Sequence, residues 1–173
     1  MVNSKQIVAA VSAILLVVVL VYPALSTGTV SVMLKSTNIE NADHVYLSIG
    51  EVWVHRLGQS SSAGWELVSN QSQTVDLVSA KNSAVTFAKG QVPVGGYDEI
   101  EMTISNVTWV FNKTTTNLSV QIPQLQTSLD FTAQAGRDSV VSVVLTGQSE
   151  MLGGGADFFI PSITANLSGV SNP

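Results

Sequence analysis

The chain has 173 residues, a net charge of −5 and only 11% charged side chains, well below the roughly 25% of an average soluble protein. It contains no cysteine, which excludes disulfides, thiolate metal sites and cysteine nucleophiles. Its few Lys and Arg residues are scattered along the chain, so no basic patch for a phosphate backbone is formed and we expect no nucleic-acid partner.

The first predicted element is an N-terminal hydrophobic helix within residues 1–26. A short polar tip with Lys5 precedes the apolar residues 7–25, which come close to the ~20 residues that span a hydrocarbon core. The same segment fits a secretory signal cleaved near Ser26, because small residues occupy the cleavage positions. A leader of the type IV pilin kind fits less well, since the acidic residue usual near the start of such helices is missing. We expect a membrane-anchored or secreted protein on the extracytoplasmic cell surface.

Residues 27–173 are the predicted exported domain, in which apolar and polar residues alternate as they do in half-buried strands. The alternation changes phase at Gly50, which predicts a bulge in one long strand, and again near Asn106. The only helical pattern is a weak one over Ser79–Ala88. About nine or ten strands are indicated, around residues 29–35, 45–54, 67, 75–77, 100–111, 118–122, 129–131, 141–145 and 158–167. The fold class is therefore all-β, an antiparallel β-sandwich or a related barrel.

The order of the strand motifs resembles the domain-of-unknown-function 4382 family of exported prokaryotic β-domains. The resemblance covers most of residues 29–168 and rests on these segments: HVYLSIGEVWVHR (44–56), GWELV (64–68), QTVDLV (73–78), PVGGYDEIEMTI (93–104), SLDFTAQAGRDSVVSVVL (128–145) and FFIPSITA (158–165). Acidic residues common in that family after the first strand and beyond the penultimate strand are replaced here at 35–37 and 146–148. The resemblance implies an exported sandwich-like domain and brings no assigned catalytic residue.

Titratable residues give weak candidates for a site. His44 and His55 share one predicted strand, which places them roughly 36 Å apart, so a two-histidine metal site is disfavoured and His55 is expected at a solvated strand end. Asp98, Glu99 and Glu101 form the densest acidic group. Glu99 and Glu101 share one face about 7 Å apart, which suits either a calcium ligand set or, as we favour, a solvated strand face. We assign no catalytic residue, cofactor or metal site.

Five sequons of the form Asn-x-Ser/Thr are candidate glycosylation sites. Three fall within residues 106–119, which are predicted to form one hairpin and its loop. Chance matches in a Ser/Thr-rich chain are the alternative explanation. The five asparagines are Asn70, Asn106, Asn112, Asn117 and Asn166.

The three tryptophans are scattered along the chain. Trp53 and Trp109 alternate with apolar strand residues, which predicts that they belong to the core. Trp65 follows a glycine in a turn, where an exposed ring could serve a carbohydrate-binding platform.

These features favour a non-enzymatic cell-surface module with a structural, adhesive or assembly role. One version is a filament subunit that self-associates by inserting residues 29–35 into a neighbouring copy; the alternative is that this strand pairs within its own domain. The second function considered is a membrane-tethered binding module for a glycan, an ion or an envelope polymer, centred on Trp65 or residues 98–101. An anchored accessory subunit of a membrane complex is the third.

Overall fold

The computed structural model describes residues 12, 26–37, 39, 41–152 and 156–171. The described chain is all-β apart from one short helix, α2 (Leu77–Ala80), and confirms the predicted number of strands. The strands are β1 (Thr27–Thr37), β2 (His44–Arg56), β3 (Trp65–Ser69), β4 (Gln73–Asp76), β5 (Val85–Pro93), β6 (Gly95–Phe111), β7 (Thr114–Val120), β8 (Gln124–Ala133), β9 (Asp138–Leu152) and β10 (Ala156–Ser171).

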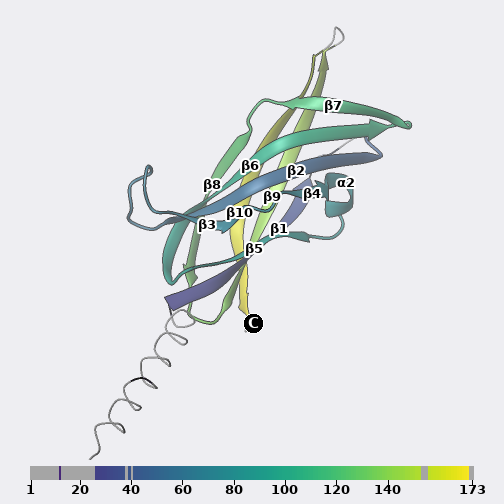
Figure 1. The fold of residues 1–173 in the computed structure, drawn as a ribbon. Helices are drawn as coiled ribbons and strands as arrows, with labels where there is room; N and C mark the ends of the chain where they lie inside the picture. The colour runs from purple at the N-terminus through teal and green to yellow at the C-terminus, as the bar shows by residue number, and fades with distance from the viewer. Residues whose placement is uncertain (1–11, 13–25, 38, 40, 153–155, 172–173) are drawn as a thin grey trace, which may run out of the picture.

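All ten strands belong to one continuous sheet that curls into a nearly closed barrel (Figure 1). Hydrogen-bonded neighbours follow the order β3-β2-β6-β7-β10-β9-β1-β5, with β4 pairing with β2 and β8 with β6. The prediction of a purely antiparallel sheet is wrong at two places, because β1 runs parallel to β9 and β10 runs parallel to β7. Period-2 alternation reports which face of a strand is buried and carries no information about the direction of its partner.

The two ends of this strand order, β3 and β5, lie against each other and bring the barrel close to closure. At the contact, a Cβ atom on Gly90 of β5 would lie only 1.8 Å from the carbonyl oxygen of Val68 in β3. Glycine is therefore required for this close approach of two backbones.

The side chains that point inward form one hydrophobic core. On β2 the buried residues include Val45, Leu47 and Ile49 before Gly50 and Val52 and Val54 after it. The pairing of β2 with β6 shifts register on both sides of Ile49, which confirms the bulge predicted near Gly50. The change of phase near Asn106 is confirmed as well, because Ser105 and Asn106 are both exposed between buried Ile104 and Val107.

The weak helical pattern over Ser79–Ala88 does not match the structure in position or length. Helix α2 covers only Leu77–Ala80, and the chain enters strand β5 at Val85. Phe87 and Ala88 are both buried, next to a register shift in the pairing of β5 with β1. The irregularity interrupts the alternation, which is why the sequence pattern did not indicate β5.

The predicted N-terminal helix within residues 1–26 lies outside the described residues, except for Ser12 and Ser26. None of the described helices has the length and apolarity needed to cross a membrane. The described domain begins at Ser26, whose carbonyl oxygen accepts a hydrogen bond of 2.9 Å from the backbone of Val94. The C-terminal end of β10 lies at the same end of the barrel as the beginning of β1 (Figure 1).

Candidate functional site

The outer face of β3, β2, β6 and β8 carries two rows of side chains that run across the four strands. Register pairs residues directly opposite one another on the same face of neighbouring strands. The first row is Leu67, Trp53, Glu101 and Gln126, and the second row is Trp65, His55, Glu99 and Ser128. With strands ≈ 4.8 Å apart, each row is about 14 Å wide. We call these two rows, together with Glu51 beside Trp53, the acidic-aromatic face.

His55 is the buried centre of the second row and is only 4% exposed. Its Nδ1 atom lies 2.7 Å from Oδ1 of Asp98, and its Nε2 atom lies 3.0 Å from the carbonyl oxygen of Ser60. The ring of Trp65 covers it, with the two ring centroids 5.0 Å apart. The prediction of a solvated strand end is therefore wrong, because the loop between β2 and β3 folds back over the imidazole.

Both partners of His55 accept hydrogen bonds, so both ring nitrogens are satisfied as donors only when the imidazole is protonated. The hydrogen bond to Asp98 is the largest influence and raises the pKa of His55 above its ordinary value of 6.5; the bond to Ser60 acts in the same direction, and burial opposes both. Asp98 reaches the ring because the register of β6 with β8 shifts between Tyr97 and Glu99. Through these two contacts His55 ties the β2–β3 loop to the acidic-aromatic face.

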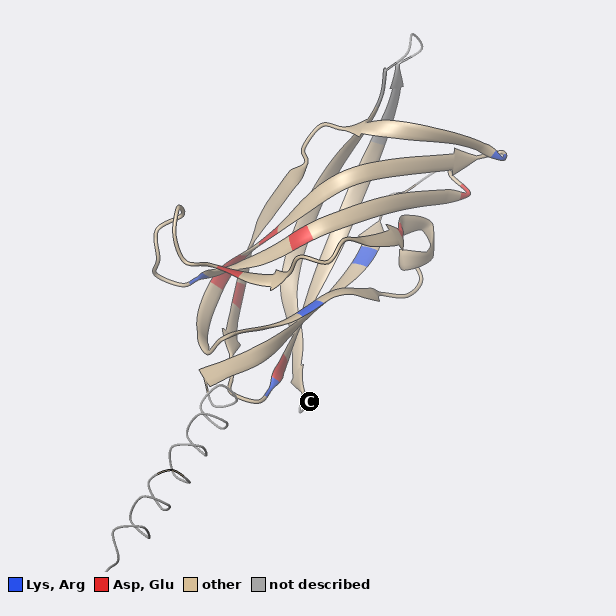
Figure 2. Cartoon of the chain, in the orientation of Figure 1, with Lys and Arg blue, Asp and Glu red and all other residues tan. Residues whose placement is uncertain are grey.

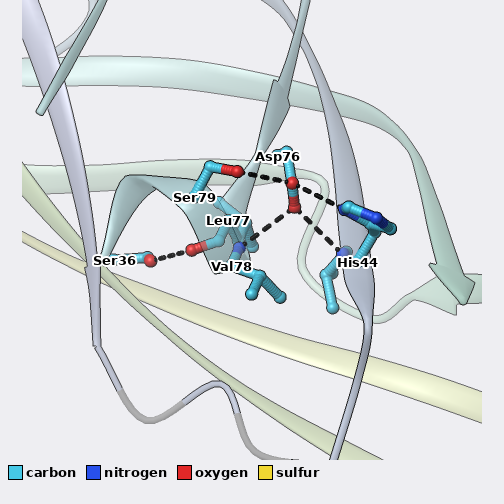
Figure 3. A network of polar contacts seen from close by, with 7 residues as sticks. Ser36, His44, Asp76, Leu77, Val78 and Ser79 are labelled. Carbon is cyan, nitrogen blue, oxygen red and sulfur yellow. Dashed lines mark hydrogen bonds and ion pairs between the residues drawn. The ribbon is translucent and has the colours of Figure 1, made fainter. Parts of the chain in front are cut away.

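His44 lies at the other end of β2 and belongs to a separate polar network around Asp76 (Figure 3). The Asp76 carboxylate accepts from Nδ1 of His44 (2.8 Å), from the Ser79 hydroxyl (2.8 Å) and from the backbone amide of Val78 (3.1 Å). Burial alone would raise the pKa of Asp76, but these hydrogen bonds, led by that of His44, together hold it below its ordinary value of 3.8.

The network joins a serine, a histidine and an aspartate, but its geometry differs from that of a hydrolytic triad. Ser79 and His44 both bond to Asp76, so the hydroxyl donates to the carboxylate and its proton is not accepted by the imidazole. Asp76 is the N-cap of α2, which gives the arrangement a structural role. The two histidines do not meet, and the described residues contain no group of three or more His, Asp or Glu side chains suited to a metal ion.

Negative charge gathers on the acidic-aromatic face. Glu51, Glu99 and Glu101 lie on it, and exposed Asp130 lies on neighbouring β8. Among the described residues, no Lys or Arg occupies either row. Figure 2 shows the charged positions as sparse segments, with acidic ones grouped on β2, β6 and the strands beside them near the β2–β3 loop.

The sequence indicated the Asp98–Glu101 cluster and Trp65 as two separate candidates, and the register of β2 with β3 and β6 brings them together. Trp53 was predicted in the core, but it is half-buried on the outer face, whereas Trp109 is buried as predicted. Sequence reasoning missed Glu51 and Leu67 as members of the face. Their odd-numbered positions place them on the same strand faces as Trp53 and Trp65, which the sequence alone could have indicated. That these faces meet across the strands follows only from the cross-strand register.

All five candidate glycosylation asparagines are exposed. Pairing of β6 with β7 confirms that residues 106–119 lie in one hairpin, with Asn112 at its turn. The amide oxygen of Asn117 accepts from the hydroxyl of Thr108, which is the sequon threonine of Asn106. Asn70 lies between β3 and β4, and Asn166 lies on β10.

The segment predicted for self-association, residues 29–35, is the middle of β1. It is hydrogen-bonded on both sides within its own chain, to β5 and to β9. Val30, Val32 and Leu34 on this strand are completely buried. Insertion into a neighbouring copy would therefore require β1 to leave the barrel and expose these three side chains.

Comparison with known proteins identifies one matching protein family. A family model described as "Domain of unknown function (DUF4382)" matches residues 27–150. The match begins with β1 and ends within β9, so the segment 158–165 on β10 lies beyond it. Searches of curated proteins and of solved structures gave no match.

Proposed function

Since the chain belongs to the DUF4382 family, as its strand motifs led us to expect, we propose that it is a non-enzymatic cell-surface module with a structural or adhesive role. In this proposal residues 7–25 tether the domain to the membrane, or are removed by cleavage near Ser26. The observation that supports an adhesive role is the acidic-aromatic face. It presents half-buried aromatic rings beside carboxylates on adjacent strands of one barrel, where strand pairing fixes their spacing.

The hydrogen bonds of the two indoles favour a preformed binding surface. The indole nitrogen of Trp53 donates to Glu51 (3.1 Å), and that of Trp65 donates to the carbonyl oxygen of Ser61 (3.0 Å). Each ring is therefore held in one orientation before any partner arrives, which reduces the entropy lost on binding. The imidazole of His55 beneath Trp65 adds a second support.

The experiment is a deletion of the gene in the native host, complemented with the wild-type chain or with a Trp53→Ala/Trp65→Ala variant. We expect the deletion to reduce attachment of cells to a surface or to one another, and the variant to fail to restore it. The Phe111→Ala variant is the control, because Phe111 is also an exposed aromatic residue but lies at the β6–β7 turn. Full restoration by the double variant would exclude this face from adhesion.

Location is tested separately on intact cells. Protease treatment from outside should release peptides of residues 27–173, and mass spectrometry of the N-terminus should distinguish a retained leader from cleavage near Ser26. The intact mass of the same sample shows whether the five sequons carry sugars. Protection of the domain until the cells are lysed would contradict an extracytoplasmic location.

The second candidate is a membrane-tethered binding module for a glycan, an ion or an envelope polymer. The specific support for a glycan or polymer is that Trp65 and the Asp98–Glu101 cluster, both named from the sequence, meet on one face. Binding of neutral polysaccharides that is lost in the Trp53→Ala/Trp65→Ala variant would favour this function over adhesion to another protein.

A further inference from the structure

The acidic-aromatic face is covered by the β2–β3 loop only at His55, and its other members lie at the surface of the sheet. Leu67 is 37% exposed, and Trp53 and Trp65 are each partly exposed. Within the described chain, β4 and α2 lie along other parts of the barrel wall, and no strand or helix is stacked on these two rows. Parts of the two indole rings and of Leu67 are thus left to water beside three carboxylates, and this combination is typical of an interaction site more than of a solvated strand face.

The chemistry of the two indoles limits what they can offer to a partner. Their N–H groups are already used in hydrogen bonds to Glu51 and to Ser61. What remains is the ring surface, whose negative π face attracts cations and stacks with planar groups. Trp53 is directly opposite Glu101 on β6, so a cation over that ring also lies close to a carboxylate on the next strand, ≈ 4.8 Å away.

The charge of the acidic-aromatic face indicates which class of partner it can bind. Glu51, Glu99, Glu101 and Asp130 are not paired with any Lys or Arg among the described residues, so the face repels phosphate- or carboxylate-rich polymers. Carboxylates accept hydrogen bonds and cannot donate them. Arg is the side chain that combines a planar stacking surface with a fork of donors matched to carboxylates.

We propose that the acidic-aromatic face binds a basic, Arg- or Lys-bearing segment of a partner protein, with a cation over Trp53 and the neighbouring carboxylates Glu99 and Glu101 as its counter-charges. This deepens the adhesive role proposed above and rests on it. Trp65, held by the loop that His55 ties down, forms the second aromatic contact, and Leu67 packs against the aliphatic stem of the bound side chain.

The test uses the full chain in detergent micelles and three probes: a hexa-arginine peptide, a hexa-glutamate peptide and a neutral glucose oligosaccharide. Tryptophan fluorescence reports binding, since two of the three tryptophans lie on the face. We expect hexa-arginine to bind and its affinity to fall with rising salt, as contacts between exposed charges do. Glu99→Gln/Glu101→Gln should weaken binding about tenfold, and Trp53→Leu about threefold.

Asp43→Asn is the matched control, because Asp43 is an exposed carboxylate at the distant turn beside Asn112. Each variant is first checked for an unchanged circular dichroism spectrum and melting temperature. The proposal is overturned if the double variant binds hexa-arginine as tightly as wild type, or if Asp43→Asn weakens binding equally, which would indicate general attraction to an acidic protein. Binding of the oligosaccharide in place of hexa-arginine overturns it in favour of a glycan.

These outcomes are separable from those of the adhesion experiment. If the deletion strain attaches normally while hexa-arginine binds the purified protein through this face, the adhesive role is refuted and the basic ligand is retained. If the deletion reduces attachment and the Glu99→Gln/Glu101→Gln variant restores it, the basic partner is refuted and the adhesive role is retained.

Discussion

Replacing His55 with Gln tests whether a buried imidazolium holds the β2–β3 loop against the barrel. The ring bonds to Asp98 at 2.7 Å and to the carbonyl oxygen of Ser60 at 3.0 Å. A glutamine amide can donate to one of these acceptors in the available space, so the other loses its partner. An unsatisfied buried acceptor costs about 1–3 kcal/mol. The side chain of Asp98 is 29% exposed and regains water, so we expect a loss of about 2 kcal/mol at low pH.

The melting temperature and its pH dependence provide the measurement. In a domain of this size 1 kcal/mol corresponds to ~2–4 °C, so the melting temperature of His55→Gln should fall by ~4–8 °C near pH 5.5. The folded-state pKa of His55 is raised above 6.5. Its stabilisation is therefore complete below the unfolded value of about 6.5 and is lost as the pH rises through the folded value. The difference in melting temperature between wild type and His55→Gln should therefore become smaller above the folded-state pKa.

His44→Gln is the control, because its side chain is 49% exposed and contacts a different carboxylate. Its effect should be smaller than that of His55→Gln. A difference in melting temperature between wild type and His55→Gln that stays constant from about pH 5.5 to 8.5 would show that folding leaves the pKa of His55 unchanged, and would refute the raised value. A difference that widens as the pH rises would refute it as well, because a ring kept neutral in the folded protein must lose its proton on folding at low pH.

Three further predictions concern the barrel itself. Gly90→Ala should destabilise the domain by about 1–3 kcal/mol because its Cβ would overlap the Val68 carbonyl oxygen, whereas Gly169→Ala, with open space around it, should change the urea midpoint little. Asp76→Ala should lower the free energy of unfolding by about 1 kcal/mol through loss of the α2 cap. Because the folded pKa of Asp76 lies below 3.8, this loss of stability should be present above that pH and shrink as the pH falls further. An acid titration followed by circular dichroism that shows the same loss of stability at every pH would contradict the prediction. Deleting residues 27–35 should unfold the domain because β1 is paired on both sides; a folded monomer that no longer forms filaments would instead support strand exchange.

The sequence by itself determined that the domain is all-β and where most of its strands lie. Alternation of apolar and polar residues marked the long strands, and its changes of phase near Gly50 and Asn106 located two irregularities that the structure contains. These features were readable because they depend on local burial along one strand. Strand β5 was missed because its burial pattern is interrupted beside a bulge, so that Phe87 and Ala88 are both buried.

The tertiary structure decided how the strands are paired and therefore which residues meet. Two parallel pairings, the near-closure of the barrel at Gly90 and the burial of His55 depend on contacts between segments far apart in the chain. The acidic-aromatic face exists only because the registers of β2 with β3 and with β6 align Trp53 and Trp65 with the carboxylates. The alternation along each strand shows which side chains share its face, but their neighbours across the sheet are set by register, which a single strand does not contain.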